Sequence, residues 1–105
     1  VPLADGIQDP EYLHLLSVHL KRILATFNPD FAFYLSGVDI LETDKFGKLK
    51  VTMQGCAQRD EFVFSTLQQQ SIPVAVAMGG GYSPKVKDIV DAHCQTFRLA
   101  QSIFC

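Results

Sequence analysis

Apolar residues recur along the chain in blocks that predict three helices and two strands. From Asp9 to Phe27, the sequence DPEYLHLLSVHLKRILATF repeats them at helical spacing. Asp9 is the expected N-cap of this helix, and Pro10 is its expected first residue. Phe31 to Leu35 and Val74 to Met78 are continuous apolar runs without alternation, a pattern typical of parallel strands that are covered on both faces.

Two further helices complete the pattern. One lies between the strands, ends near Gln70 and has Phe62, Val63 and Leu67 as predicted buried positions. The other is expected to start with Ser83 as its N-cap. It carries an apolar stripe formed by Val86, Ile89, Val90, His93, Phe97 and Ala100, in which the histidine is expected to be a core residue bonded to a carbonyl. Strand, helix and strand form a β-α-β unit, so the predicted fold class is α/β with a parallel sheet.

Composition excludes several classes of protein. The 105 residues are 48% hydrophobic, enough for one core but too few for two domains of about 100–200 residues each. The formal charge is -2 and no basic tract is present, so nucleic acid is not an expected direct partner. No apolar run approaches the roughly 18 residues of a membrane span, so no membrane partner is expected. Cys56, Cys94 and Cys105 are widely spaced, which favours a reducing, cytoplasmic location over a disulfide framework or a cysteine zinc site.

The connection from Ser36 to about Thr52 is much longer than the roughly 2–6 residues usual between a strand and a helix. In open parallel sheets, ligands bind beyond the carboxyl ends of the strands. This loop leaves one such end, and the glycines before Tyr82 leave the other. Asp39 and Tyr82 are therefore expected to face a common crevice.

The local pattern leaves two interpretations open for each polar residue of this crevice. The Asp39 carboxylate could ligate a metal ion, or it could bond backbone N–H groups in a turn. Asp44 either supports such a site from behind or is a solvated side chain. Tyr82 could donate its hydroxyl to an oxyanion, or it could pack its ring at the edge of the core with the hydroxyl in water.

Gly79, Gly80 and Gly81 permit positive φ angles and a close approach of the backbone to a ligand. As a phosphate-binding signature they are weak, because the G-x-G-x-x-G spacing and the Gly-Lys-Ser/Thr of a P-loop are both absent. A nucleotide-binding α/β protein is therefore the less favoured alternative. His14 and His19 point to different faces of one helix and are not a metal-binding pair.

Two motifs, in this order and at this separation, resemble the zinc-dependent histone deacetylase family. The segment YLSGVDILETDKFGKLKVTMQGCAQRDEFVFSTL contains G-V-D followed by D-x-x-G, and IPVAVAMGGGYS contains G-G-G-Y. The chain is similar to the C-terminal third of that domain, most of all in class IV members and their bacterial relatives. The resemblance implies that residues 1–105 are the C-terminal portion of a single deacetylase domain. It also implies a three-layer α/β/α arginase-deacetylase fold around a parallel sheet.

The resemblance further implies a role for each site residue. Asp39 matches the last zinc ligand of the family, and Tyr82 matches the tyrosine that donates to the oxyanion during removal of an acyl group. The expected substrates are an acylated lysine of a protein or a small acetylated amine. Thr43 departs from the pattern, because class IV relatives usually have glycine there.

The other family ligands, an Asp-x-His pair, and the histidine pair that acts as general base lie upstream of Val1 in the family pattern. An upstream part of the same protein is thus the expected partner that completes the Zn²⁺ site. The chain alone is expected to be inactive, since a catalytic zinc normally takes three protein ligands. The alternative is a deacetylase-like remnant that acts as a non-catalytic binding or interaction module.

Overall fold

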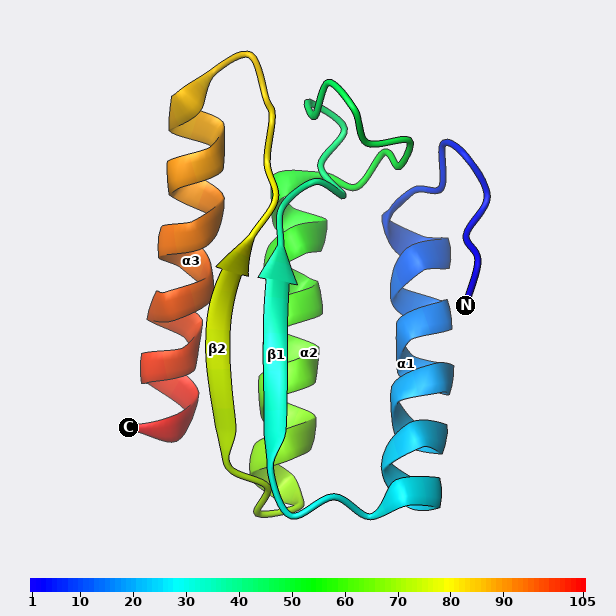
Figure 1. Cartoon of the computed structure of the whole chain (residues 1–105), viewed down its shortest axis with the longest axis vertical. Helices are drawn as coiled ribbons and strands as arrows, with labels where there is room; N and C mark the ends of the chain where they lie inside the picture. Colours follow the sequence, from blue (N-terminus) through cyan, green and yellow to red (C-terminus); the bar gives the residue numbers. More distant parts are fainter.

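The computed structural model describes residues 1–105 and contains three helices and a two-stranded parallel sheet (Figure 1). The elements in chain order are α1 (Asp9–Phe27), β1 (Ala32–Gly37), α2 (Met53–Gln69), β2 (Val74–Gly79) and α3 (Val86–Phe104). The strands pair in parallel from Ala32 opposite Val74 to Gly37 opposite Gly79. This arrangement confirms the predicted α/β class with a parallel sheet. No helix combines the length and the apolar character needed to span a bilayer.

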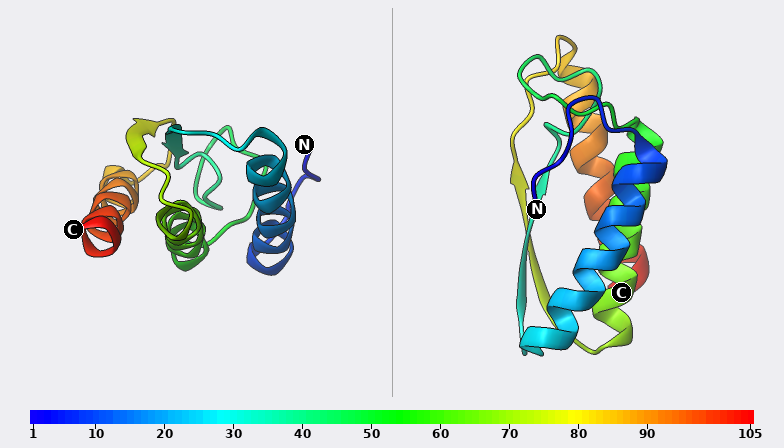
Figure 2. Two further views of the ribbon diagram at one scale, coloured as in Figure 1. Left: turned by 90° about the horizontal axis from the view of Figure 1, so that it is seen from below. Right: turned by 90° about the vertical axis from the view of Figure 1, so that its right-hand side faces the viewer.

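All three helices lie on one side of the sheet, with α2 between α1 and α3 (Figure 2). The residues of β1 therefore alternate between two environments. Tyr34 and Ser36 are covered, whereas Phe33 and Leu35 are 87% and 69% exposed. Within this chain one face of each strand is uncovered, so the cover predicted for that face is not supplied by these 105 residues. The continuous apolar runs arise because the face turned away from the helices is apolar as well.

Apolar side chains form two small clusters. One consists of Leu24, Val63, Leu67 and Ile72, with the inner side chains of both strands packed against it. The other consists of Val38, Leu41, Cys56 and Ala92 and includes the loop that follows β1. Of the three predicted core positions of α2, Val63 and Leu67 are buried and Phe62 is half-buried. The long loop is thus part of the core rather than a strand-to-helix linker outside it.

The N-cap predicted at Asp9 is wrong. α1 begins at Asp9 itself, and Gln8 occupies the N-cap position. The Asp9 carboxylate instead accepts hydrogen bonds from the backbone N–H of Thr52, at 2.8 Å, and from the Thr52 hydroxyl. That hydroxyl also accepts from the N–H of Gly55, at 3.0 Å, and so caps α2. Asp9 therefore ties the first turn of α1 to the first turn of α2.

The N-cap predicted at Ser83 is also wrong, because α3 begins later, at Val86. The Ser83 hydroxyl lies 2.8 Å from the hydroxyl of Thr43 in the other loop. The buried side chains of α3 are Ala92 and Thr96. Three of the six residues in the predicted apolar stripe are exposed: Val86, Val90 and Phe97. Ile89, His93 and Ala100 are half-buried, and Ile89 packs against the second apolar cluster. The apolar periodicity of α3 therefore marks a face that this chain covers only in part.

A buried carboxylate joins β1, α2 and α3. Asp60 of α2 is 1% exposed, and its Oδ1 accepts hydrogen bonds from the Tyr34 hydroxyl at 2.5 Å and from Arg59 Nε at 2.9 Å. Its Oδ2 accepts from the Thr96 hydroxyl of α3. Burial raises the pKa of the Tyr34 hydroxyl, which therefore remains a proton donor to Asp60. One side chain thus satisfies polar groups from all three elements.

The Arg59 guanidinium extends this network to the end of β1. It donates to the Gly37 carbonyl at 2.5 Å and to the Ser36 hydroxyl at 3.0 Å. Burial alone would lower the pKa of Arg59, but Tyr34, Cys56 and Asp60 outweigh it and hold that pKa above its ordinary value. The guanidinium therefore stays charged although it is 5% exposed.

Removing the Asp60 carboxylate should destabilise the protein far more than removing its exposed neighbour. Asp60→Ala leaves the Arg59 charge buried and unpaired, a loss of about 3–5 kcal/mol in the free energy of unfolding. Glu61→Ala, on the solvent side of the same helix, should change that free energy by no more than about 0.5 kcal/mol. Urea denaturation of both variants of the whole gene product measures the difference. Equal midpoints for the two variants would contradict this account of the network.

Candidate functional site

The loops that follow β1 and β2 leave the sheet at the same end, where both arrowheads point in Figure 1. The last paired residues are Gly37 and Gly79, and the N–H of Val38 donates to the Gly79 carbonyl at 3.1 Å. Because the strands are parallel, both loops start at carboxyl ends, where open α/β sheets bind ligands. Asp39 and Tyr82 therefore both lie at the end of the sheet that is suited to a functional site.

Asp39 is exposed, and its side chain lines an open pocket of about 310 Å³. The polar and glycine residues that share this pocket are Tyr12, Gly37, Arg59, Gly79 and Gly80. The Asp39 carboxylate takes part in none of the hydrogen bonds of the chain, so it does not stabilise a turn. It is free to bind a ligand in the pocket.

Glycines allow the second loop to pack directly on the first. Gly80 and Gly81 have positive φ angles of 64° and 112°. A Cβ atom on Gly80 would lie 3.1 Å from Cγ of Asp39, and one on Gly81 would lie 2.8 Å from Cγ2 of Val38. Both positions therefore need glycine for backbone conformation and for space. Gly79, by contrast, is the last residue of β2.

Asp44 joins the two loops. Its Oδ2 accepts from the N–H groups of Phe46 at 3.0 Å and Gly47 at 2.7 Å, and its Oδ1 accepts from the N–H of Tyr82 at 2.6 Å. Burial alone would raise the pKa of Asp44, but the three backbone donors, Tyr82 foremost, outweigh it and lower that pKa below its ordinary value. Asp44 is 7% exposed, so the interpretation of a solvated side chain is wrong. Of the two loop aspartates, Asp44 rather than Asp39 holds the turn.

Tyr82 is fixed by its backbone and exposed through its side chain. Its carbonyl accepts from the N–H of Lys45 at 3.2 Å, which adds to the bond between its N–H and Asp44. The ring is 61% exposed and packs edge to face on Phe46, with 5.2 Å between the centroids. Tyr82 does not line the Asp39 pocket. The structure therefore brings together the two loops, the Asp39 carboxylate and Gly80. The Tyr82 side chain is exposed and outside this pocket, so the predicted crevice common to Asp39 and Tyr82 is not formed by this chain.

Two residues of the pocket were missed from the sequence. Arg59 and Tyr12 both line it beside Asp39. Burial raises the pKa of the Tyr12 hydroxyl, although the Arg59 guanidinium opposes the shift. A signal for Arg59 did exist, since the Arg-Asp pair stands between apolar core positions of α2 and such a pair needs polar partners when buried. Nothing in the local sequence distinguishes Tyr12 from a core residue of α1.

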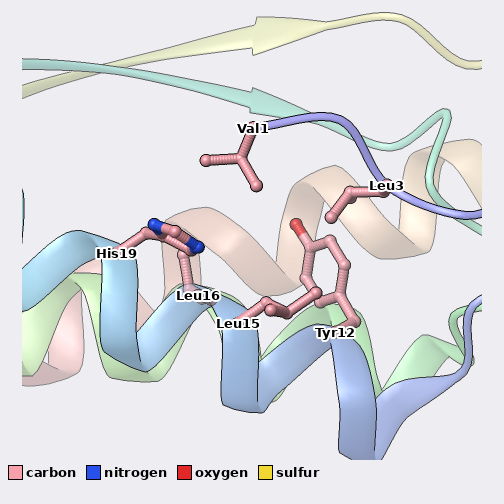
Figure 3. Close-up of a pocket in the computed structure, with 6 residues that line it drawn as sticks. All are labelled: Val1, Leu3, Tyr12, Leu15, Leu16 and His19. Atoms are coloured by element: carbon pink, nitrogen blue, oxygen red, sulfur yellow. The ribbon is translucent and has the colours of Figure 1, made fainter.

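A second hollow, of about 190 Å³, lies between α1 and the N-terminal segment (Figure 3). Its lining is mostly apolar and consists of Val1, Leu3, Tyr12, Leu15, Leu16 and His19. Figure 3 shows the Tyr12 hydroxyl directed toward the N-terminal segment. The only histidine here, His19, has no other potential metal ligand in the hollow.

His93 of α3 was predicted to bond a carbonyl. Its buried Nδ1 instead has no hydrogen-bond partner.

This chain offers one side chain, Asp39, that could serve as a ligand of a metal ion. No group of three His, Cys, Asp or Glu residues lies close enough to hold a metal ion. Asp39 nevertheless offers an unpaired carboxylate in an open pocket, and carboxylate oxygen is an accepted zinc donor. A zinc ion bound there would need its remaining ligands from outside these 105 residues.

Substituting Gly80 should disturb the site more than substituting another glycine of the same conformation. Gly80→Ala combines a positive φ with a contact against Asp39, whereas Gly6→Ala has a positive φ of 77° and nothing within 4 Å of the added Cβ. We expect Gly6→Ala to lower the free energy of unfolding by about 1–2 kcal/mol, the cost of the left-handed conformation, and Gly80→Ala to lower it further. Chemical denaturation measures both changes. A Gly80→Ala variant as stable as Gly6→Ala would show that the contact with Asp39 is not tight.

The lowered pKa of Asp44 predicts a contribution to stability that is lost in acid. The folded-state pKa lies below the ordinary value of about 3.9, so the unfolded state takes up the proton first as the pH falls. The contribution is therefore complete above that ordinary value and disappears as the pH falls through the folded-state pKa. Asp44→Asn should flatten the decline in the free energy of unfolding below about pH 5, measured by urea titration at a series of pH values. Glu42→Gln removes an exposed carboxylate of the same loop and should flatten the decline less. Equal slopes for the two variants would contradict the predicted contribution of Asp44.

Comparison with known proteins identifies the family. The model of the histone deacetylase domain matches residues 1–97. An uncharacterized protein of Picosynechococcus sp. is 37% identical over 102 residues, which cover 97% of this chain and 34% of that protein. Histone deacetylase 2 of Arabidopsis thaliana is 35% identical over 82 residues, covering 78% of this chain and 21% of that protein. The chain thus spans about a third or less of the length of these relatives.

Solved structures agree on the fold. Acetylpolyamine aminohydrolase from Burkholderia pseudomallei matches with a TM-score of 0.81 at 18% identity, over 98% of this chain and 28% of that one. The HD domain of HDA15 matches with a TM-score of 0.73 at 21% identity, over 93% of this chain and 27% of that one. These likenesses show the arginase-deacetylase fold. Together with the domain match over residues 1–97, they lead to one conclusion: the chain belongs to the histone deacetylase family.

Proposed function

We propose that this chain is part of a zinc-dependent amidohydrolase that removes acetyl or longer acyl groups from lysine side chains. Membership of the histone deacetylase family supports the class of reaction. The observation that carries the proposal is the packing of Gly80 against an unpaired Asp39 carboxylate. Gly80 lies two residues before Tyr82 in the same loop. A ligand bound by Asp39 would therefore lie next to the loop that presents the tyrosine.

In the proposed mechanism Asp39 is the one zinc ligand that this chain supplies. Bound zinc would polarise the acyl carbonyl and lower the pKa of a water molecule toward about 7. Tyr82 donates its phenolic O–H to the carbonyl oxygen as negative charge develops there. A donor held in position before the reaction stabilises that charge without a cost of reorganisation at the moment of reaction. Gly80 and Gly81 let the loop that carries Tyr82 pack against Asp39 and Val38, which supports a shared role for the two loops.

The remaining zinc ligands and the general base would come from an upstream part of the same protein. Only Asp39 is available in the pocket, and a catalytic zinc takes three protein ligands. The 105-residue chain by itself is therefore expected to be inactive. Arg59 supports this site indirectly, because it holds the Gly37 carbonyl directly before the turn that carries Asp39.

The test uses the whole gene product, assayed for bound zinc and for hydrolysis of an acetyl-lysine peptide and an acetylated polyamine. We expect zinc-dependent hydrolysis that a chelator abolishes and added zinc restores. Tyr82→Phe should lower kcat by about 10²–10³ with the zinc content unchanged, because one preorganised donor is lost. Asp39→Asn should lower the zinc content itself.

Glu42→Gln provides the matched control, since it removes an exposed carboxylate of the same loop and should change neither zinc content nor rate. A Tyr82→Phe variant with the parent rate would refute the role of the tyrosine. A protein that binds the acylated peptide without zinc and without hydrolysis would instead support a non-catalytic binding module. The ratio of the two substrate activities separates a lysine deacylase from an enzyme of small acetylated amines.

A further inference from the structure

We propose that Asp44 is a positioning residue that holds Tyr82 in place for catalysis, an inference that rests on the proposed function of Tyr82. Asp44 does not line the Asp39 pocket, so any effect it has on the reaction must pass through another residue. Its Oδ1 accepts from the N–H of Tyr82 at 2.6 Å. This is the only side-chain acceptor that the Tyr82 backbone uses.

The Tyr82 side chain has few restraints of its own. Its loop begins with Gly80 and Gly81, whose positive φ angles let the backbone take paths that other residues avoid. The Tyr82 ring is 61% exposed and has only the exposed ring of Phe46 as an aromatic neighbour. α3 begins at Val86 and has no side-chain cap that would hydrogen-bond to the loop. Whatever fixes the direction of the phenol must therefore act through the backbone near Tyr82.

Three consecutive residues of the other loop supply that restraint. Asp44 accepts from the Tyr82 N–H, and the N–H of Lys45 donates to the Tyr82 carbonyl at 3.2 Å. The Thr43 hydroxyl lies 2.8 Å from the hydroxyl of Ser83. Asp44 is the buried member of the three and the only charged acceptor, and a hydrogen bond to a charged acceptor is stronger than one between neutral groups. The tyrosine is thus attached to the same loop that carries Asp39.

The two oxygens of Asp44 have separate tasks, and this separation allows a selective test. Oδ2 closes the local turn with Phe46 and Gly47, whereas Oδ1 serves only Tyr82. Asparagine keeps one oxygen, which can still close the turn, and replaces the other with an NH₂ group that cannot accept from the Tyr82 N–H. Asp44→Asn therefore removes the attachment of Tyr82 while the turn remains.

The experiment is a double-mutant cycle in the whole gene product, with Asp44→Asn, Tyr82→Phe and the combined variant. We expect Asp44→Asn to lower kcat by about 10-fold to 100-fold, the cost of a misplaced catalytic group, with little change in KM or zinc content. The combined variant should be no slower than Tyr82→Phe, because Asp44 acts only through the hydroxyl that the second change removes. Glu42→Gln, on the same loop, is the control that should leave kcat unchanged.

Amide hydrogen exchange provides a readout that is independent of activity. Asp44→Asn should speed exchange at the Tyr82 amide and leave the amides of Phe46 and Gly47 protected. Unchanged protection at Tyr82, or losses of activity that multiply in the combined variant, would overturn the inference. If Asp44→Asn does not fold, amide exchange in the unaltered protein replaces it: the Tyr82 amide should be protected as well as those of Phe46 and Gly47, and fast exchange at Tyr82 would overturn the inference.

The proposed function fails separately, when Tyr82→Phe retains the parent rate. Impairment by Tyr82→Phe together with a fully active Asp44→Asn would refute the positioning role alone.

Discussion

The arrangement of β1, α2 and α3 depends on the hydrogen bonds that the buried Asp60 carboxylate accepts. This carboxylate satisfies Tyr34 from β1 and Thr96 from α3, and it pairs with Arg59 beside it on α2. Arg59 in turn donates to the Gly37 carbonyl, at the point where the chain leaves the sheet toward Asp39. The orientation of the candidate site therefore rests on a polar network, whose geometry is directional, as well as on apolar packing, which is not.

Those features that depend on local sequence were predictable. α1 spans the predicted residues because amphipathic periodicity defines its length and Asn28-Pro29 ends it. Both strands were found from their apolar runs, and the α/β class followed from the order of elements. The true roles of Asp9 and Ser83 could not be predicted from local sequence. Each side chain bonds a residue far along the chain, Thr52 and Thr43 respectively, instead of acting as a helix N-cap. The same limit applies to α3, since periodicity reports which residues are apolar and not whether anything covers them.

The candidate site divides in the same way. Topology alone brought Asp39 and Tyr82 to one end of the sheet, because parallel strands release their loops together. The attachment of Tyr82 to Asp44 could not be predicted from spacing, since it joins residues that are distant in sequence and meet only in the folded chain. Tyr12 was missed for a related reason, because it looks like an ordinary residue of α1 until the pocket beside the strand ends is formed. Arg59 was signalled only as a buried Arg-Asp pair, and that signal does not place it beside Asp39.

Two aspartates of one loop have opposite environments, and the contrast is the reason for assigning the proposed metal-ligand role to Asp39 rather than Asp44. Asp44 accepts three backbone N–H groups, which lower its pKa and satisfy its oxygens, so it has little capacity left for a cation. Asp39 accepts none and faces an open pocket. A carboxylate without internal partners pays no cost of breaking hydrogen bonds when it binds a metal. Because Asp44 stabilises the turn, the Asp39 carboxylate is not needed for that purpose. A single carboxylate could not both accept the backbone hydrogen bonds that hold the turn and remain unpaired for a ligand.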